Sequence, residues 1–199
     1  MIERILRFAL ERHGMVPVPS SPEPPIAREG PLVALRPRYE HIDILLKWFN
    51  DPQVTRFMDS PGDKYTKDDL VEDFLVYQSD DVACIVLEEA SGSPVGYGSI
   101  YSINKGNGSA DMSFLVGEED QRGKGYGKAI VRMLQRIAFE EMGLHSIDVT
   151  VTTENEPSLR ALKACGFKRI GILKDYHKVD GERYDEVVLQ CLATYRRIK

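Results

Sequence analysis

The sequence predicts an α+β domain in which a mixed, mostly antiparallel sheet of about seven strands is flanked by about four helices. Alternating apolar runs over residues 82–87, 95–103 and 110–116 are separated by turn residues, which is typical of consecutive antiparallel strands. An amphipathic helix is expected over 125–142, because apolar residues recur there at helical spacing and Gly143 follows where helices commonly end. A later strand, a helix and two more strands complete an α+β order.

The segment before this domain has a different composition. Apolar residues near the N-terminus recur at helical spacing and predict a short amphipathic helix: Ile2, Ile5, Leu6, Ala9 and Leu10. Residues 16–31 are rich in proline, which removes backbone donors and favours an extended linker. We therefore expect the folded domain to span residues 32–199. The stiff linker would let the helix dock either on its own domain or on a second subunit, which leaves a homodimer open.

The other elements follow from the same signals. Residues 32–35 predict a first strand, and 42–49 predict a helix that ends before Pro52. Thr66, with acidic residues in the turn after it, is expected to begin a second helix that ends near Asp80. The later elements expected are a strand over 147–151, a helix over 157–164 and strands over 167–172 and 187–192.

The composition argues against several classes of protein. With 199 residues, 42% of them hydrophobic, the chain can bury one continuous core. No apolar run reaches the roughly 20 residues of a membrane span, and no secretory signal pattern is present, which predicts a cytoplasmic protein with no membrane partner. The formal net charge of −5 argues against a nucleic-acid partner. The three cysteines, Cys84, Cys165 and Cys191, are far apart and indicate free thiols, with neither disulfides nor a metal site.

The most informative segment is a glycine-rich loop between the strand at 110–116 and the helix after it. Gly123, Gly125 and Gly127 let the backbone approach a ligand closely, and the N–H groups at a helix start have no intrahelical acceptor. Three basic side chains are interleaved with these glycines: Arg122, Lys124 and Lys128. Because the helix dipole adds positive charge at the same end, the loop predicts a site for a pyrophosphate.

Two better-known phosphate loops do not fit this segment. A P-loop requires a Ser or Thr after its Gly-Lys pair to bind magnesium, and a Rossmann fingerprint belongs to an early βαβ unit with an acidic residue about 20 positions later. Neither pattern is present, so a nucleotide hydrolase is not favoured.

At these residues the chain resembles the GNAT superfamily of N-acetyltransferases, whose loop reads Gln/Arg-x-x-Gly-x-Gly/Ala and is matched by Arg122, Gly125 and Gly127. The resemblance implies the GNAT fold, with splayed fourth and fifth strands, and acetyl-CoA as the cofactor. It also implies that the loop amides hold the pyrophosphate and that the preceding strand binds the pantetheine arm through its backbone. The cofactor-binding residues expected on this basis are Phe114, Leu115, Val116, Arg122, Gly123, Lys124, Gly125, Tyr126, Gly127, Lys128 and Asn155.

A second motif of the family runs from Asn155 to Phe167, and the resemblance covers residues 32–193 in all. Asn155 is expected to cap a short helix or to offer its amide to a ligand. The family often carries a tyrosine seven residues later as the acid that protonates the leaving thiolate, whereas this chain has Leu162. Ser158 matches a serine of the RimJ/RimL-like branch and is the candidate acid, with an ordinary helix-face residue as the alternative.

The resemblance points to Asp111 as the general base, because residues 110–113 resemble an Ala-Glu-Ile-Gly segment of the family with Asp in place of Glu. A surface aspartate is the alternative, and further candidates on neighbouring strands are Glu88, Glu89 and Tyr97. A backbone N–H near Leu115 is expected to polarise the acetyl carbonyl. Covalent catalysis by Cys84 or Cys165 is not favoured, because no motif places a histidine beside either thiol. The four histidines are interpreted as surface or cap residues: His13, His41, His145 and His177.

The expected function is acetyl transfer from acetyl-CoA to a primary amine by direct attack. The acceptor stays open between a protein N-terminus, a polyamine, an aminoglycoside and an amino sugar. Segments 50–65 and 175–183 carry acidic residues that suit a cationic acceptor, although loops are often acidic for solubility alone. The alternative is a non-catalytic acyl-CoA-binding sensor or scaffold, motivated by Leu162 and Asp111 at the positions of the family's tyrosine and glutamate.

Overall fold

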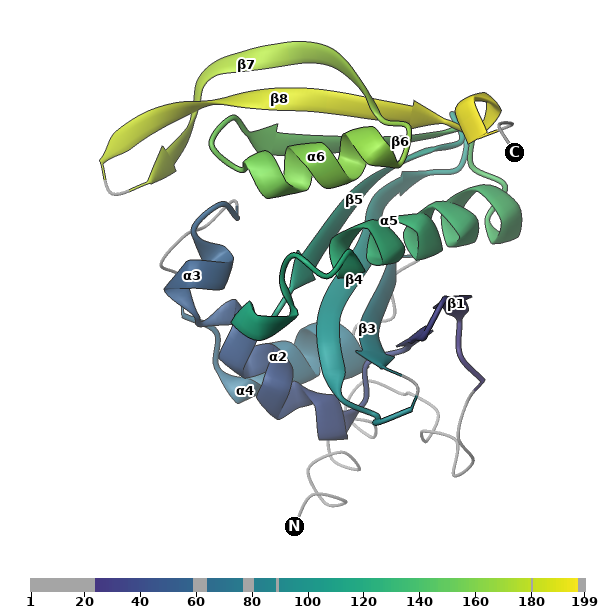
Figure 1. The fold of residues 1–199 in the computed structure, drawn as a ribbon, viewed down its shortest axis with the longest axis vertical. Helices are drawn as coiled ribbons and strands as arrows, with labels where there is room; N and C mark the ends of the chain where they lie inside the picture. The colour runs from purple at the N-terminus through teal and green to yellow at the C-terminus, as the bar shows by residue number, and fades with distance from the viewer. Residues whose placement is uncertain (1–23, 59–63, 77–80, 89, 180, 197–199) are drawn as a thin grey trace.

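The chain folds as an α+β domain around an eight-stranded sheet (Figure 1). The computed structural model describes most of the chain: residues 24–58, 64–76, 81–88, 90–179 and 181–196. The strand order is β1-β2-β3-β4-β5-β6-β8-β7, and only β5 and β6 pair in parallel. The expected fold class is confirmed, with one strand more than expected. The helix expected over residues 2–10 and the first part of the linker lie outside the described residues.

The strands are β1 (Ala27–Glu29), β2 (Leu32–Leu35), β3 (Val82–Glu88), β4 (Pro94–Asn104), β5 (Ser109–Val116), β6 (Ser146–Thr152), β7 (Lys168–Val179) and β8 (Glu182–Leu192). The helices are α2 (Ile42–Phe49), α3 (Pro52–Thr55), α4 (Lys67–Val71), α5 (Tyr126–Arg136) and α6 (Glu156–Ala164). Two π-helical stretches continue α4 and α5: Glu72–Val76 and Ile137–Glu141.

The end of α2 and the start of α4 are as expected, whereas the short helix α3 between them was not predicted. α2 ends before Pro52, which then opens α3 with Asp51 as its cap, since Asp51 Oδ1 accepts the Gln53 N–H at 2.9 Å. Thr66 begins α4 in a reciprocal capping box with Asp69. These local signals are strong because each satisfies a backbone N–H that the first helical turn leaves unpaired.

β1 corrects the expected domain boundary, because it lies inside the segment interpreted as linker. It pairs with β2 through a tight turn at Gly30, whose φ of +55° suits glycine. Glu29 on β1 accepts from two arginines of α5, Arg132 at 3.3 Å and Arg136 at 2.9 Å. The sheet therefore begins at Ala27 instead of Leu32, and the proline-rich composition concealed a hairpin.

The hairpin of β7 and β8 is longer than the sequence indicates. Strands were expected over 167–172 and 187–192, and the structure extends them to Lys168–Val179 and Glu182–Leu192. Much of the added part is charged and therefore resembled a loop. The Lys174 ammonium lies 2.6 Å from the Asp185 carboxylate across the two strands, so cross-strand pairs take the place of an apolar pattern.

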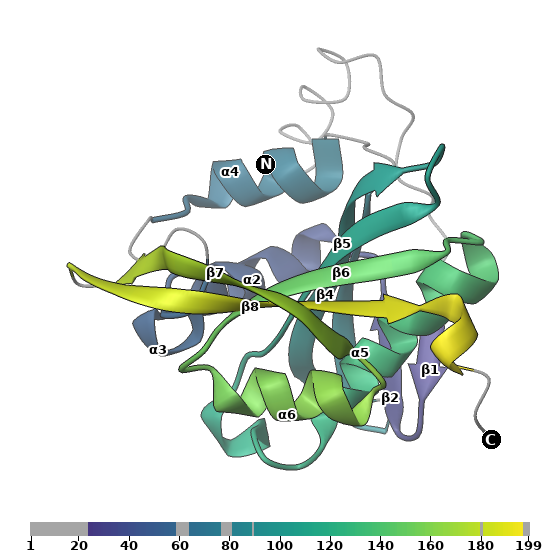
Figure 2. The same ribbon diagram turned by 90° about the horizontal axis from the view of Figure 1, so that it is seen from above.

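The sheet has helices on both faces (Figure 2). We call the side with α5 and α6 the α5 face and the side with α2 and α4 the α2 face. On the α5 face, Ile130 and Leu134 pack in one core with Met112 of β5. On the α2 face, Trp48 packs in a second core with Tyr97 of β4. Alternate residues of β4 and β5 thus serve two different cores.

Gly96 of β4 permits the close approach of both β5 and α5. A Cβ at this position would lie 2.2 Å from the Leu115 carbonyl oxygen and 2.8 Å from Ile130 Cδ1. The nearer atom is backbone, so the neighbouring strand cannot yield by turning a side chain. Glycine here fixes how tightly the strand that carries the candidate site packs against β4.

We expect Gly96→Ala to destabilise the fold by about 1–3 kcal/mol, the usual cost of overpacking a close-packed core. Urea unfolding followed by circular dichroism measures the change. The matched control is Gly171→Ala on β7, because a Cβ there meets nothing within 4 Å. The control should stay within about 0.5 kcal/mol of the wild type. Equal unfolding midpoints for both variants would contradict the close approach.

Candidate active site

The candidate site is built where β5 and β6 diverge. The two strands pair only from Ser109–Asp111 to Ser146–Asp148, although β5 continues to Val116 and β6 to Thr152. We call the diverging parts, Met112–Val116 and Val149–Thr152, the two arms of the splay, and the position of Asp111 and Asp148 its vertex (Figure 1). The expected splay of the fourth and fifth strands is confirmed, and it leaves backbone groups of both arms without a sheet partner on the inner side.

The backbone directions along β5 narrow one expectation. Gly117 donates its N–H to the Val95 oxygen across β4 at 3.0 Å. Because alternate residues of a strand turn their N–H groups to the same neighbour, the N–H of Leu115 also points toward β4, where Leu115 is paired with Tyr97. The groups that face the splay are therefore those of Phe114 and Val116. The carbonyl-polarising N–H expected near Leu115 would therefore be that of Phe114 or Val116.

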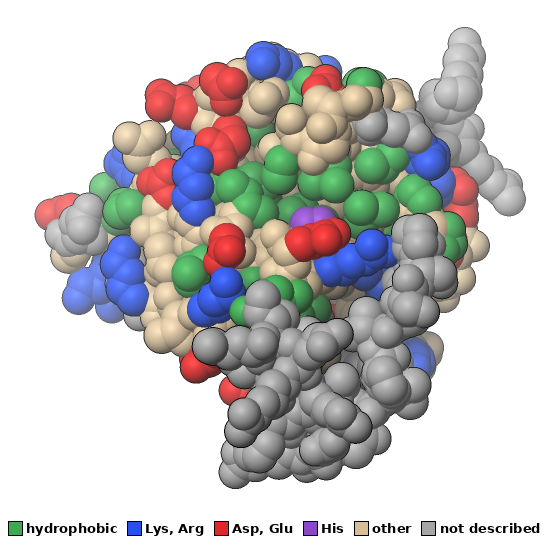
Figure 3. All heavy atoms as spheres, turned by 90° about the horizontal axis from the view of Figure 1, so that it is seen from below, with side chains coloured by type: hydrophobic (Ala, Val, Ile, Leu, Met, Phe, Trp, Pro, Cys, Tyr) green, Lys and Arg blue, Asp and Glu red, His purple; other side chains and the backbone are tan. Residues whose placement is uncertain are grey.

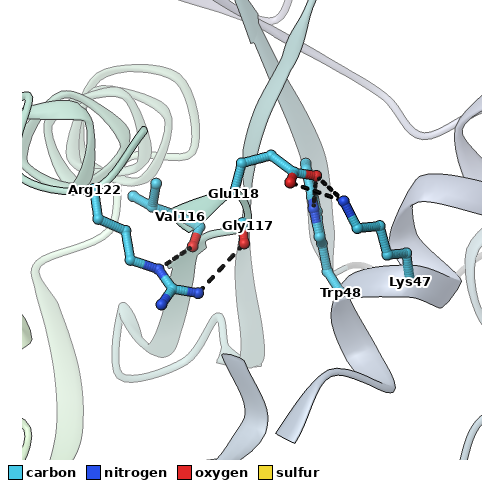
Figure 4. Close-up of polar contacts among 6 residues, drawn as sticks. All are labelled: Lys47, Trp48, Val116, Gly117, Glu118 and Arg122. Carbon is cyan, nitrogen blue, oxygen red and sulfur yellow. Dashed lines mark hydrogen bonds and ion pairs between the residues drawn. The ribbon is translucent and has the colours of Figure 1, made fainter. Parts of the chain in front are cut away.

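The end of β5 is held against α2 by a buried tryptophan (Figure 4). Trp48 is fully buried, and a Cβ on Gly117 would lie 2.0 Å from its ring, so the indole packs directly on the strand backbone. Glu118 accepts from Trp48 Nε1 at 2.9 Å and from Lys47 Nζ at 2.7 Å. These hydrogen bonds, the one from Lys47 first, hold the pKa of the Glu118 carboxyl below its usual value. The strand therefore enters the glycine loop from a fixed position.

The glycine loop has the geometry of an anion site. Gly125 caps α5 in the left-handed region at φ +88°, and no side chain caps this end. The first bond within the helix is donated by Ala129 to the Gly125 oxygen, so the N–H groups before it have no intrahelical acceptor. A Cβ at Gly125 would meet only Lys128 Cε at 3.8 Å. The loop therefore leaves room above its backbone for a ligand and offers it unpaired donors.

The basic residues of this loop have different surroundings. The Arg122 guanidinium donates to the backbone oxygens of Val116 at 3.5 Å and Gly117 at 3.4 Å, so it ties the loop to the end of β5 (Figure 4). Lys124 donates to the Gln121 side chain at 3.2 Å. The side chains of Arg122, Lys124 and Lys128 are all exposed. They place positive charge at the α5 N-terminus, where the helix dipole also favours an anion.

Contacts between α5 and β5 position the other predicted cofactor residues. A Cβ at Gly127 would lie 3.6 Å from Phe114 and 3.9 Å from Val116, so the first turn of α5 lies directly over the β5 arm. Phe114, Val116 and Tyr126 pack against the α5-face core, whereas Leu115 packs against the α2-face core. Among the predicted cofactor residues of β5 and the α5 start, only the Leu115 side chain belongs to the α2-face core.

Asn155 and Ser158 open α6, beside the end of the β6 arm. Asn155 is the helix cap, because its Oδ1 accepts the Ser158 N–H at 3.3 Å. Ser158 is half-buried in the first turn. Leu162, at the position of the family's tyrosine, is fully buried in the α5-face core. Leucine carries no hydroxyl, which leaves Ser158 as the hydroxyl that this helix offers near the splay.

Asp111 occupies the vertex and projects to the α2 face, since the adjacent Met112 belongs to the core on the other side. Partial burial is the main cause that raises the pKa of its carboxyl, and the neighbouring charge of Asp148 adds to it. A hydrogen bond with Ser102 opposes the shift. A carboxylate with a raised pKa is a better proton acceptor, which is what a general base requires.

Two of the further base candidates, Tyr97 and Glu88, lie away from the vertex of the splay. Tyr97 lies in the aromatic cluster of the α2-face core, 5.3 Å from Phe49 and 5.6 Å from Phe74 between ring centroids, and burial raises its pKa. Glu88 accepts the Ser91 hydroxyl at 2.8 Å in the turn after β3. Glu89 lies outside the described residues. Burial also raises the pKa of the Cys84 thiol to about 12, which makes it a poor nucleophile.

One histidine corrects the interpretation of all four as surface or cap residues, and another fits it. His41 is buried and accepts the Arg38 N–H through Nδ1 at 3.0 Å, a capping role. His177 is 5% exposed and forms a pair with the equally buried Glu186 at 3.2 Å. The sequence pattern missed this pair, since both residues lie in the part of the β7–β8 hairpin that resembled a loop.

The described residues contain no helix long and apolar enough to cross a membrane. Within the same part of the chain, no three His, Cys, Asp or Glu side chains gather where they could bind a metal ion.

Comparisons with known proteins agree with this geometry. Residues 32–168 match the family model described as the acetyltransferase (GNAT) domain. A relative from Bacillus licheniformis, named uncharacterized N-acetyltransferase p20, is 26% identical over 158 residues, which cover 77% of this chain and 88% of the relative.

Two solved structures share the fold at low sequence identity. The spermidine N-acetyltransferase of Vibrio cholerae, in complex with CoA and spermine, superposes with a TM-score of 0.77 at 18% identity over 84% of this chain and 98% of its own. RimJ of Mycobacterium smegmatis, in complex with CoA-disulfide, gives a TM-score of 0.74 at 20% identity over 84% and 85%. At such identities the likeness establishes the fold.

We expect acetyl-CoA to raise the melting temperature of the wild type, while acetate leaves it unchanged, because most of the affinity should come from the loop amides. At a ligand concentration of about 100 times Kd the gain is about 2.7 kcal/mol. Gly125→Val should abolish this shift by filling the space above the loop.

The matched control is Gly143→Val after α5. Gly143 also has a positive φ, +67°, and open space around a Cβ, so the two variants share the backbone strain. Differential scanning fluorimetry measures both. A Gly125→Val protein that keeps the full shift would show that the loop does not bind the cofactor.

Proposed function

This chain belongs to the acetyltransferase (GNAT) family and is an acetyl-CoA-dependent acyltransferase, and we propose that it transfers the acetyl group to a primary amine by direct attack. The observation that carries the proposal is the junction of the splay with the uncapped N-terminus of α5. The splay offers backbone groups without a sheet partner to an extended ligand chain. The N-terminus of α5 offers N–H donors and positive charge to a diphosphate. Acetyl-CoA combines these two parts and supplies an activated acetyl thioester.

The residues that would hold acetyl-CoA fit it by their surroundings. The N–H groups from Gly123 to Lys128 would bind the pyrophosphate, with Lys124 and Lys128 adding charge. Arg122 would also contribute by holding the loop backbone in place, since its guanidinium donates hydrogen bonds to the backbone oxygens of Val116 and Gly117 at the end of β5. Phe114 and Val116 would bind the pantetheine part of acetyl-CoA through the backbone groups that face the splay. Asn155 would contribute its amide nitrogen from the start of α6.

Three groups of the chain would carry the chemistry. Asp111 would accept the proton that the amine loses through a chain of water molecules, because it lies four residues, or about 13 Å, along the strand from Leu115 and is too far for direct contact. A backbone N–H of Phe114 or Val116 would stabilise charge on the carbonyl oxygen. Ser158 would donate a proton to the departing sulfur. Direct attack is supported by the buried Cys84 and by the raised pKa of the half-buried Cys165 thiol.

The acceptor that this site favours is a cationic amine. Asp111 and Asp148 lie side by side at the vertex, on the face away from the cofactor loop. Neighbours of the same fold include a spermidine acetyltransferase and RimJ, which is consistent with an amine acceptor without selecting one. On the side shown in Figure 3, acidic and basic side chains of the described residues are interspersed, and no single sign of charge covers that face.

The proposal is tested by the release of free thiol from acetyl-CoA when single amines are supplied. The panel contains spermidine, a tetrapeptide with a free N-terminus, kanamycin and glucosamine. We expect release with at least one amine at a rate well above hydrolysis, and mass spectrometry should find that amine heavier by one acetyl group. Binding of acetyl-CoA without thiol release from any amine would favour the sensor or scaffold instead.

We expect Asp111→Asn to lower kcat by on the order of 100-fold, the lower range for losing a general base, with little change in acetyl-CoA affinity. The wild-type rate should fall as pH drops through the raised pKa of Asp111, and the variant should lose that acidic limb. Asp148→Asn is the control. Asp148→Asn removes the neighbouring like charge that adds to the raised pKa of Asp111. The acidic limb of the pH–rate profile of this variant should therefore move to lower pH. Wild-type rates at every pH for Asp111→Asn would remove this residue from the mechanism.

A further inference from the structure

His177 of β7 and Glu186 of β8 form a buried polar pair that the proposed mechanism does not use. His177 Nδ1 lies 3.2 Å from Glu186 Oε1, and each side chain is 5% exposed. His177 Nε2 is shielded from solvent and has no hydrogen-bond partner among the described residues. A buried polar atom without a partner is costly, so it calls for a physical explanation.

The pairing determines what the free nitrogen can do. With Nδ1–H donated to the Glu186 carboxylate, a neutral ring presents a lone pair at Nε2. In that tautomer Nε2 can accept an N–H from a ligand.

Thr152 supplies a second unpartnered atom beside this pair. It is 1% exposed, its Oγ1 has no hydrogen-bond partner among the described residues, and it is paired directly with Glu186 across β6 and β8. Directly paired residues of antiparallel strands project to the same face of a sheet. Thr152 Oγ1 and the His177–Glu186 pair thus lie together on one face.

The register places this group on the acceptor side of the splay. Thr152 lies four residues beyond Asp148 along its arm, as Leu115 lies four residues beyond Asp111 along the other, so the two are level. Thr152 alternates with Val151 and Val149, which pack in the α5-face core, and therefore projects to the opposite face. The cofactor loop is on the α5 face, so Thr152 stands across the β6 arm from it.

The backbone is also shaped at this point. The register of β7 and β8 shifts between Leu173 and His177. Within that shift Asp175 has a φ of +49°, and its N–H donates to Asp185 Oδ1 at 3.1 Å. Bulges of this kind redirect a side chain, and they are common beside active sites.

We propose that His177 Nε2 and Thr152 Oγ1 bind the primary amine of the acceptor, with Glu186 as the positioning residue behind the imidazole. The inference rests on the proposed acetyl transfer and names the residues that bind its acceptor. An amine or ammonium offers the N–H donors that both atoms lack, and the Glu186 carboxylate favours a cation nearby. The amine must displace the groups that cover the two atoms, a cost that the new hydrogen bonds offset.

The kinetic test uses the full-length protein and the panel amine with the highest wild-type rate. His177→Gln and Thr152→Val should each raise KM for that amine about tenfold, with kcat and the acetyl-CoA thermal shift nearly unchanged. Thr152→Ser keeps the hydroxyl and should restore the wild-type KM. Matched controls are His145→Gln and Thr150→Val, since both residues are exposed and Thr150 projects from the same face of β6. The controls should behave as the wild type.

The double variant tests whether both residues bind one nitrogen. If they do, His177→Gln combined with Thr152→Val should raise KM by less than the product of the two single effects. A fall in kcat at constant KM for His177→Gln would overturn the binding role and make His177 the proton acceptor in place of Asp111. An unchanged KM in both single variants would also overturn it.

A binding measurement separates this proposal from the proposed function. With coenzyme A present in place of acetyl-CoA, isothermal titration calorimetry should show spermidine or the tetrapeptide binding to the wild type about tenfold more tightly than to either variant. A wild type that binds the amine in this way without releasing thiol would refute acetyl transfer and keep the subsite. Equal amine affinity in wild type and both variants would refute the subsite.

Discussion

The early end of the parallel pairing between β5 and β6 is the constraint on which the rest of the site depends. The two strands pair only over Ser109–Asp111 of β5. Beyond the vertex, the β5 arm pairs only with β4 and the β6 arm only with β8. A parallel connection needs a long crossover, and here α5 makes it over one face. The crossover explains why the N-terminus of α5 lies at the end of the β5 arm. Splay, glycine loop and helix dipole are therefore consequences of one topology.

Separate cores keep the two arms in place. The β5 arm is held by Trp48 on one face and by the first turn of α5 on the other, with Gly117 and Gly127 permitting the two approaches. The β6 arm is held by its long pairing with β8. Since neither anchor uses the inner backbone groups of the splay, those groups stay available to a ligand. This division also accounts for the two sides of the proposed site, with donors for an anion on the α5 face and acceptors for an amine on the α2 face.

The sequence predicts most of the fold because its signals are local. The cap Thr66, the proline after α2, the glycine after α5 and the alternating strands of the centre each follow from backbone or burial requirements within a few positions. The strand β1 and the long β7–β8 hairpin were missed because tertiary contacts, such as Glu29 with α5, stabilise segments whose composition resembles a loop. The glycine loop was found from its motif. The pair of His177 and Glu186 carries no motif, since it exists only through the register of a hairpin.

Backbone strain gives independent weight to the α2 face as the place where the acceptor reacts. Among the described residues that are not glycine, Ser102 and Asp175 alone have positive φ, at 53° and 49°. Each lies within a register shift of its strand pair, and each neighbours a candidate residue, since Ser102 bonds Asp111 and Asp175 shortly precedes His177. Strain of this kind costs on the order of 1–3 kcal/mol and persists where surrounding structure enforces it. The fold tolerates this cost twice, and among the described residues Asp148, Thr152 and His177 have buried side-chain atoms without a hydrogen-bond partner on or beside one sheet face. Both observations support the proposal that a ligand rich in N–H donors binds there.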